Sequence, residues 1–279
     1  MSVHNPAGNY RFLGEKGRPF SGGAVADQGF DMVHAILERP LPLDRGLAAV
    51  VRHLEEVGRP VQAIAGFELR IPKPFTGEEF STFNQGYVQA LESIGLVADG
   101  MLPAARTNVS ATIGGVSEPS VYAATFSVKG SRGRPAYVMS GVAEEKPGDI
   151  DSMFESMMRV LGSRMEELGV KWHDATAIQL YGADDVQGRL VEQVLKHLGP
   201  AAIHGIHWFP SRPPIEGLRL EIDVRSAGTE LVNRFPNRAV AGSLRPSVAG
   251  KPGSNVTDAS IKNPLRPRAF ELSLRTYSA

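Results

Sequence analysis

The chain has 279 residues, of which 42% are hydrophobic and 22% charged, with 30 basic and 30 acidic side chains and no cysteine. This composition is typical of a globular protein with one large domain or two smaller ones. A formal net charge of zero gives no overall field for nucleic acid or an anionic membrane, and the lack of cysteine excludes disulfides, thiolate metal sites and a cysteine nucleophile.

The N-terminal stretch MSVHNPAGNYRF has no basic segment followed by an apolar run, so we expect no signal peptide. No uninterrupted apolar stretch approaches the length of a membrane span. We therefore expect a cytoplasmic protein.

Hydrophobic periodicity predicts a helix–strand–helix–strand–strand unit in the first part of the chain. Its first helix has one apolar face, and Gly58 follows as a stop signal. The predicted segments are a helix over 43–58, a strand over 60–71, a helix over 77–95, and strands over 102–110 and 120–128.

The same order then starts again, with a leading strand over 136–144. Asp149 or Asp151 is available to cap the first helix of this second unit, and core packing explains the methionines of that helix better than a cofactor does. The remaining segments are a helix over 149–169, a strand over 171–182, a helix over 185–199, and strands over 202–210 and 218–227. The repeat indicates an internal duplication.

We predict an N-terminal domain over 1–130, a C-terminal domain over 131–228 and a Pro/Gly/Arg-rich arm over 229–279. The arm has no sustained periodicity, so it either wraps on its own or a neighbouring subunit or is disordered. No aromatic stacking platform is interleaved with its arginines, so we do not expect nucleic-acid binding.

Arg106 stands at the start of the strand predicted in LPAARTNVS (102–110). By pattern alone it is either a solvated edge charge or a fixed clamp for an anion. Asn108 lies two positions further along, on the same face of the strand. It could orient water or substrate, or be a solvated polar side chain.

Several motifs resemble the Rid (YjgF/YER057c/UK114) family, whose members are mostly imine and enamine deaminases. LPAARTNV resembles the strand that presents an arginine to the substrate carboxylate, and EFSTFNQGYVQAL resembles the second helix, with Asn84 and Tyr87 at the family's spacing. GRPFSGGAV resembles the loop in which Phe20 and Ser21 border the pocket, with Phe20 where tyrosine is common. AYVMSGVAE and the segment after it resemble a second copy.

The resemblance implies an α+β fold of two tandem Rid-like (chorismate-mutase-like) domains, each a mixed β-sheet with two helices packed on one face, followed by the extended arm. It implies a small-molecule carboxylate substrate and a homotrimer with ligand sites between subunits; a dimer is the alternative. It calls for no cofactor and no metal.

The second unit departs from the family pattern. The place of the arginine falls near His204, while Glu221 and Asp223 keep acids on the last strand, where the first unit has Ala124. This suggests two specialised halves with one kind of competent site. His204 and His207 are three apart in a strand-like segment and point to opposite faces, a spacing that is poor for a shared metal.

Glu221 and Asp223 share one face of their strand, so the pair could raise one pKa and supply a general acid. Alternatively they face solvent or pair with Arg219 or Arg225. Tyr87 is also a core position, and Asn84 either caps a loop or reaches the pocket. Ser140 lacks the surroundings of a serine nucleophile.

We therefore expect a hydrolytic deaminase of a small carboxylate-bearing enamine or imine, of the 2-aminomuconate type, that releases ammonia. Arg106 would bind the substrate carboxylate. The alternatives are a chorismatase-like hydrolase and a non-catalytic protein that binds a carboxylate metabolite.

Overall fold

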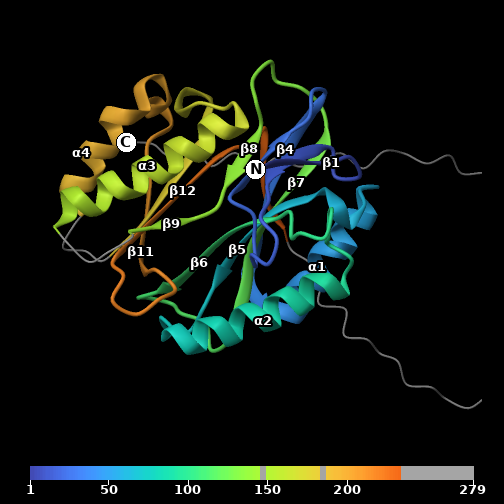
Figure 1. Cartoon of the computed structure of the whole chain (residues 1–279), viewed down its shortest axis with the longest axis horizontal. Helices are drawn as coiled ribbons and strands as arrows, with labels where there is room; N and C mark the ends of the chain where they lie inside the picture. Colours follow the sequence, from blue (N-terminus) through green and yellow to red (C-terminus); the bar gives the residue numbers. More distant parts are fainter. Residues whose placement is uncertain (145–148, 183–186, 234–279) are drawn as a thin grey trace, which may run out of the picture. The chain divides into compact units, whose positions relative to one another are not determined.

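The structure of the chain is a computed structural model that describes residues 1–144, 149–182 and 187–233. In these residues the strands form one large mixed sheet, and two pairs of α-helices lie on opposite sides of the strands (Figure 1). The expected α+β class is confirmed. None of the helices in this part of the chain is long and apolar enough to span a membrane.

The α-helices are α1 (Leu43–Glu56), α2 (Gly77–Ser93), α3 (Ile150–Leu168) and α4 (Gln187–Leu198). The strands of the N-terminal half are β1 (Ser2–Asn5), β2 (Tyr10–Leu13), β3 (Gly23–Ala26), β4 (Phe30–Pro42), β5 (Ile64–Arg70), β6 (Ala105–Ala111) and β7 (Ser120–Lys129). Those that follow are β8 (Tyr137–Met139), β9 (Val142–Ala143), β10 (Ala177–Gly182), β11 (His207–Arg212), β12 (Leu220–Ser226) and β13 (Thr229–Asn233).

The two parts of the sheet are built in the same way. In the N-terminal half β5 runs parallel to β6 and antiparallel to β7. In the C-terminal half β10 runs parallel to β11 and antiparallel to β12. Each parallel pair is joined by a helix, α2 or α4, because parallel strands need a crossover connection.

The helix limits follow local signals in the sequence. Gly58, just after α1, has a φ of +69°, and Gly169, the C-cap of α3, has a φ of +72°, a conformation that favours glycine. The carboxylate of Asp149 accepts hydrogen bonds from the amides of Asp151 and Ser152, so Asp149 is the residue that caps α3.

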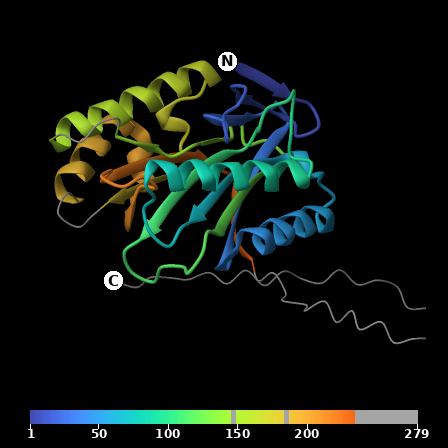
Figure 2. The ribbon, with the colours of Figure 1, turned by 60° about the horizontal axis from the view of Figure 1, so that its bottom comes forward.

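Each helix pair covers a hydrophobic core of its own. Under α1 and α2 the core includes Leu47, Phe67, Tyr87 and Leu91. Under α3 and α4 it includes the four methionines that the helix pattern assigned to packing, Met153, Met157, Met158 and Met165. That interpretation is confirmed. Figure 2 shows α2 lying across the strands of the N-terminal half.

The two halves are continuous through the sheet. β3 pairs with β8, with Val25 opposite Tyr137, and β11 pairs with β6, with Ser211 opposite Ala111. β13 runs parallel to β4. Thr229–Asn233, which we expected at the start of the arm, therefore form a strand, and residues 234–279 of the predicted arm lie outside the described residues.

Two predicted strands differ from the structure. The strand over 136–144 is broken at Ser140 and Gly141, because their polar groups bond to neighbouring segments instead of continuing the ladder. The strand over 202–210 begins only at residue 207, because Pro200 starts a 3₁₀ helix over 199–204 and Gly205, with a φ of +71°, ends it.

Candidate active site

Arg106 lies on β6 with its side chain under α2. The residue is only 3% exposed, and its guanidinium carbon lies 4.3 Å from the ring centre of Phe20 and 4.8 Å from that of Tyr87. The rings of Phe80 and Phe83 lie at 5.7 and 5.5 Å. The alternative in which Arg106 is a solvated edge charge is therefore wrong. Burial lowers the pKa of Arg106 to about 10, so the side chain remains a cation at neutral pH.

Several polar side-chain atoms of β6 and α2 are buried without a hydrogen-bond partner among the described residues. They are Nη1 of Arg106, the hydroxyl of Tyr87, Oδ1 of Asn84, and both amide atoms of Asn108. A buried polar group without a partner costs about 1–3 kcal/mol, so proteins rarely retain several of them together. An anion could accept hydrogen bonds from Nη1 of Arg106, the hydroxyl of Tyr87 and the amide nitrogen of Asn108, while the amide oxygens of Asn84 and Asn108 need a donor such as an amine or water.

Ser140 and Gly141, at the break between β8 and β9, hold the backbone of Arg106 from the other half of the chain. The amide of Arg106 donates to Oγ of Ser140 at 2.8 Å, and that hydroxyl donates to the carbonyl of Ser21 at 2.6 Å. The amide of Gly141 donates to the carbonyl of Arg106 at 3.1 Å. The break in the strand thus fixes the start of β6 against the N-terminal segment.

Glu221, on β12, reaches the same region from the C-terminal half. The residue is 4% exposed, and its carboxylate lies against Gly141, where any added Cβ would collide with it. Burial and the charge of Asp223 raise the pKa of Glu221 to about 8, although the backbone of Asn108 and the charge of Arg106 favour ionisation. Glu221 is therefore mostly protonated at neutral pH.

Asp223 shares the strand face of Glu221 but makes different contacts. Its carboxylate accepts hydrogen bonds from the hydroxyls of Thr107 at 2.8 Å and Tyr181 at 2.9 Å, and lies 3.9 Å from Arg225. Burial and the charge of Glu68 raise its pKa. The predicted shared face is correct, and the alternative of a solvent-facing pair is wrong because both residues are buried.

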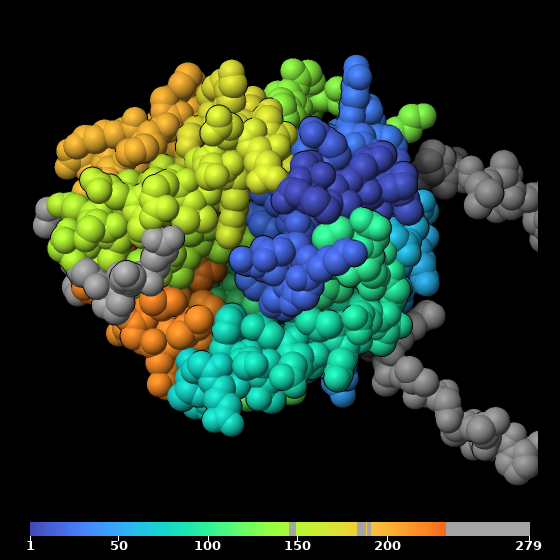
Figure 3. All heavy atoms as spheres, viewed as in Figure 1, coloured from blue at the N-terminus to red at the C-terminus, as the bar shows by residue number. Residues whose placement is uncertain are grey.

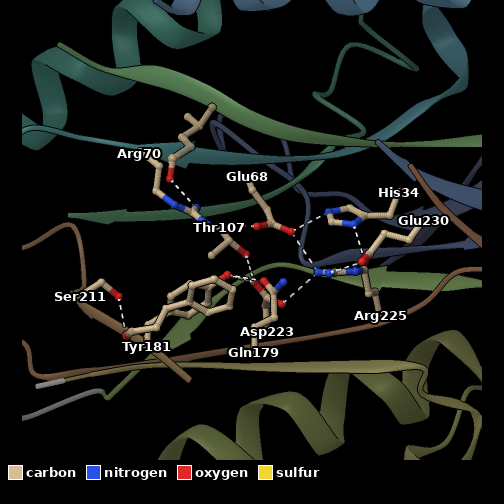
Figure 4. Close-up of polar contacts among 12 residues, drawn as sticks. His34, Glu68, Arg70, Thr107, Gln179, Tyr181, Ser211, Asp223, Arg225 and Glu230 are labelled. Carbon is tan, nitrogen blue, oxygen red and sulfur yellow. Dashed lines mark hydrogen bonds and ion pairs between the residues drawn. The ribbon is translucent and has the colours of Figure 1, made fainter. Parts of the chain in front are cut away.

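Asp223 belongs to a buried charge network that joins the two halves of the sheet (Figure 4). Glu68 accepts from Nε2 of His34 and from Nη1 of Arg225, both at 2.9 Å, and from Arg70 at 3.4 Å. Glu230 contacts His34 at 3.0 Å and Arg225 at 3.2 Å. Strands β4, β5, β12 and β13 each contribute to these contacts.

The network sets the charge of its members. Burial acts to raise the pKa of Glu68, but Arg225, His34 and Arg70 outweigh it and hold that pKa well below its ordinary value. Burial and Arg225 act to lower the pKa of His34, but its hydrogen bonds to Glu230 and Glu68 prevail and raise it. The network therefore pairs ions of opposite sign, of which Glu230 is half-exposed and the others are buried.

The structure places some of the other predicted site residues beside Arg106 and others away from it. Phe20 and Tyr87 lie around Arg106, and Tyr87 is at the same time part of the core under α2. Asn84 lies on α2 between Phe80 and Tyr87 and lines the cavity described below. The hydroxyl of Ser21 points to the carbonyl of Gly23 at 3.3 Å, so only the backbone of Ser21 takes part in the site.

His204 does not lie where the sequence placed it. It is exposed, and it belongs to the 3₁₀ helix over 199–204 instead of the strand position that corresponds to Arg106. Among the described residues, neither His204 nor His207 belongs to a cluster of three or more potential metal ligands.

A cavity of about 590 Å³ lies between the N-terminal segment that contains Gly17 and Pro19 and the helix α2. Phe80 and Asn84 line it, and the ring of Phe80 also lies 5.7 Å from the guanidinium carbon of Arg106. On this face of the molecule the surface dips where α2, α3 and the dark-blue N-terminal segment approach one another (Figure 3). The remaining lining residues are Gly17, Pro19, Gly77, Ser81, Gln85, Val88, Gln89 and Glu92.

The site includes residues that sequence reasoning did not single out. Phe80 and Phe83 were read only as the apolar face of α2, and Ser140 was set aside because it is no nucleophile. The only signal for Ser140 and Gly141 was a Ser-Gly pair in the middle of a short apolar strand.

Comparison with known proteins decides the family. The family model described as 2-aminomuconate deaminase CnbZ matches residues 2–231. The chain belongs to the CnbZ family. The sequence motifs predicted a chain related to the Rid deaminases, and the match to this deaminase family confirms that expectation. The 2-amino-5-chloromuconate deaminase of Comamonas testosteroni is 33% identical over 249 residues, which cover 82% of this chain and 98% of that protein.

Solved structures are more distant from this CnbZ-family chain. A chorismatase crystal structure is 14% identical with a TM-score of 0.49, over 77% of this chain and 79% of that one. A YjgF/YER057c/UK114 family protein from Mycobacterium tuberculosis is 19% identical with a TM-score of 0.29, over 34% of this chain and 81% of that one.

Proposed function

We propose that this chain is a deaminase that hydrolyses the C–N bond of a 2-aminomuconate-type enamine and releases ammonia. The family match and the named relative support the substrate type. The observation that carries the proposal is the buried guanidinium of Arg106, whose Nη1 has no partner among the described residues. A substrate carboxylate would supply that partner in a charge-assisted, bidentate contact.

The reaction proceeds by water addition. The enamine takes a proton on carbon and loses one from nitrogen to become the imine. Water then adds to the imine carbon, and the resulting carbinolamine loses ammonia and leaves a ketone. Arg106 holds the carboxylate next to the reacting carbon and withdraws electron density from it, which favours attack by water. Asn108, whose side-chain amide atoms have no partner within residues 1–144, 149–182 and 187–233, orients the substrate or the water.

Glu221 is the proton donor in this proposal. It is buried beside Gly141 and the backbone of Asn108, and its raised pKa of about 8 keeps it protonated at neutral pH. A carboxylic acid in this state can give a proton to the enamine carbon or to the departing amine.

Glu221→Gln is expected to lower kcat/KM by about 10²-fold, because glutamine cannot donate a proton. In the wild type, kcat/KM should fall as the pH rises through about 8, because protonated Glu221 is lost, and this fall should be absent in the variant. Rate measurements from pH 6 to 10 check both points. Glu216→Gln, an exposed change, serves as the control. A wild-type rate that rises through pH 8 would mean that Glu221 acts as a base.

The direct test of the function is ammonia release from freshly prepared 2-aminomuconate, measured with a coupled ammonia assay. Wild type should exceed the buffer rate by several orders of magnitude. If the purified chain binds the compound but releases ammonia no faster than buffer, it is a carboxylate-binding protein and the deaminase proposal fails.

We also infer a homotrimer that acts in the cytoplasm. The inference is supported by the resemblance to Rid domains, which generally form trimers with ligand sites between subunits.

A further inference from the structure

A second arginine lies next to the structure that holds Arg106. Arg164, on α3, is half-buried, and its Nη1 donates to the carbonyl of Ser140 at 3.4 Å. Ser140 is the residue whose hydroxyl accepts the amide hydrogen of Arg106. A Cβ placed on Gly22 would lie 3.4 Å from Nε of Arg164, so this side chain also packs against the segment that carries Phe20.

The two arginines therefore approach one region from opposite halves of the chain. The guanidinium carbon of Arg106 lies 4.3 Å from the ring centre of Phe20, and Arg164 of α3 lies beside Gly22, two residues further along the same segment, where an added Cβ would meet its Nε. The hydroxyl of Ser140 accepts a hydrogen bond from the backbone amide of Arg106, and its carbonyl accepts one from the guanidinium of Arg164. Figure 3 shows the N-terminal segment between α2 and α3 on this face.

The electrostatic surroundings of Arg164 are unfavourable for a cation. Among the described residues it forms no ion pair, and the charge that acts on it is that of Arg18. Burial, followed by the like charge of Arg18, lowers the pKa of Arg164 to about 10. Arg18 pairs with Glu15 at 2.7 Å, but within the described part of the chain Arg164 has one long hydrogen bond, to a carbonyl. Burying a guanidinium in this way is costly unless an anion completes the site.

We propose that Arg164 binds the second carboxylate of a dicarboxylate substrate whose first carboxylate is held by Arg106. The proposal rests on the proposed function. It assigns the binding of the substrate's second carboxylate to a residue of the C-terminal half. Two guanidinium groups from two halves would hold both ends of the molecule and place the amine-bearing carbon between them. Arg164 would then determine specificity for dicarboxylates over monocarboxylates.

Muconate and sorbate separate the two carboxylates in a binding experiment. Both are six-carbon dienes with one carboxylate in common, but sorbate carries a methyl group where muconate has its second carboxylate. Neither has an amine, so neither reacts. Isothermal titration calorimetry at pH 7.5 would measure both ligands with wild type, Arg164→Met, Arg164→Lys and, as a control, Arg52→Met, which removes an exposed charge on α1.

Wild type should bind muconate at least about tenfold more tightly than sorbate, since a hydrogen bond between charged groups is worth that much or more. Arg164→Met should reduce this preference to about twofold and leave sorbate binding unchanged. Arg164→Lys should retain part of the preference, and Arg52→Met all of it. Equal binding of the two ligands by wild type, or an undiminished preference in Arg164→Met, would overturn the proposal.

The proposed function can fail independently. If wild type prefers muconate through Arg164 but does not deaminate 2-aminomuconate, the two-arginine site stands and the deaminase activity does not. If wild type does not bind muconate at all, the assignment of Arg164 is wrong, whatever the enzyme turns over. Circular dichroism of each variant identifies any that is misfolded. If Arg164→Met is misfolded, the preference for muconate over sorbate is compared between wild type and Arg164→Lys instead.

Discussion

Arg106→Met is expected to lower kcat/KM for 2-aminomuconate by about 10³-fold. Each hydrogen bond between charged groups is worth about 1.5–3 kcal/mol, and a guanidinium that binds a carboxylate in a bidentate manner makes two of them. Two such bonds correspond to roughly 10²- to 10⁴-fold. Initial rates of ammonia release over a range of substrate concentrations measure the effect.

The same variant should not lose stability, and this separates a functional role from a structural one. Arg106 is buried, its Nη1 has no partner in the part of the chain that the structure describes, and methionine can fill the space among the surrounding aromatic rings. The thermal midpoint of Arg106→Met should therefore equal or exceed that of wild type. Residues that serve activity often cost stability, so replacing them can stabilise a protein. Arg106→Lys keeps the charge without the planar pair of donors, so its activity should be intermediate. Activity of Arg106→Met within tenfold of wild type would rule out the clamp.

Local sequence signals predicted the helices well, because each helix is fixed by neighbouring residues. Gly58 and Asp149 act within one turn of the helix they end or begin, and the apolar spacing of α1 and α3 reports directly on the face that is buried. The order of the elements after residue 43 followed from the same signals. In contrast, β4 was not predicted as an element of its own, because Met32, Val33, His34 and Ala35 are all buried and so lack the alternation of a half-buried strand.

The candidate site could not be predicted from the spacing of residues in the sequence alone. Arg106 was weighted toward function only by the family resemblance, since the pattern alone also fitted a solvated charge. Glu221 reaches the backbone of Asn108 because β12 lies next to the break at Gly141, a contact between residues more than a hundred positions apart. His204 was placed by alignment to a strand, but Gly205 and Pro200 set a different backbone.

The charge network could not be predicted from local sequence patterns either. His34, Glu68, Arg225 and Glu230 come from four strands, and β13 was expected to be part of an arm. Arg225 was considered only as a possible partner of the acids on β12. The partner it contacts most closely, Glu68, lies in the other half of the chain, so the network joins the two halves.

Glu68→Gln is expected to destabilise the fold by about 3–5 kcal/mol, the usual effect of breaking a buried ion pair by removing one partner. The change leaves the guanidinium of Arg225, which is 3% exposed, beside a neutral amide, and weakens the contacts to His34 and Arg70. Chemical denaturation at pH 7 measures the loss in the free energy of unfolding. Glu55→Gln, an exposed change on α1, should stay within about 0.5 kcal/mol of wild type.

The pH dependence gives a second test of the network. The folded-state pKa of Glu68 is well below the value of about 4.3 that an unfolded chain would have. Its contribution is therefore fully present above that pH and is lost as the pH falls towards the folded-state pKa. Wild type should lose stability between about pH 5 and 3, and Glu68→Gln should lose less over that interval because it has no carboxylate to protonate. If the two proteins have the same stability at pH 7 and the same acid dependence, the contacts of Glu68 do not hold the halves together, and the sheet pairing of β3 with β8 and β6 with β11 does so instead.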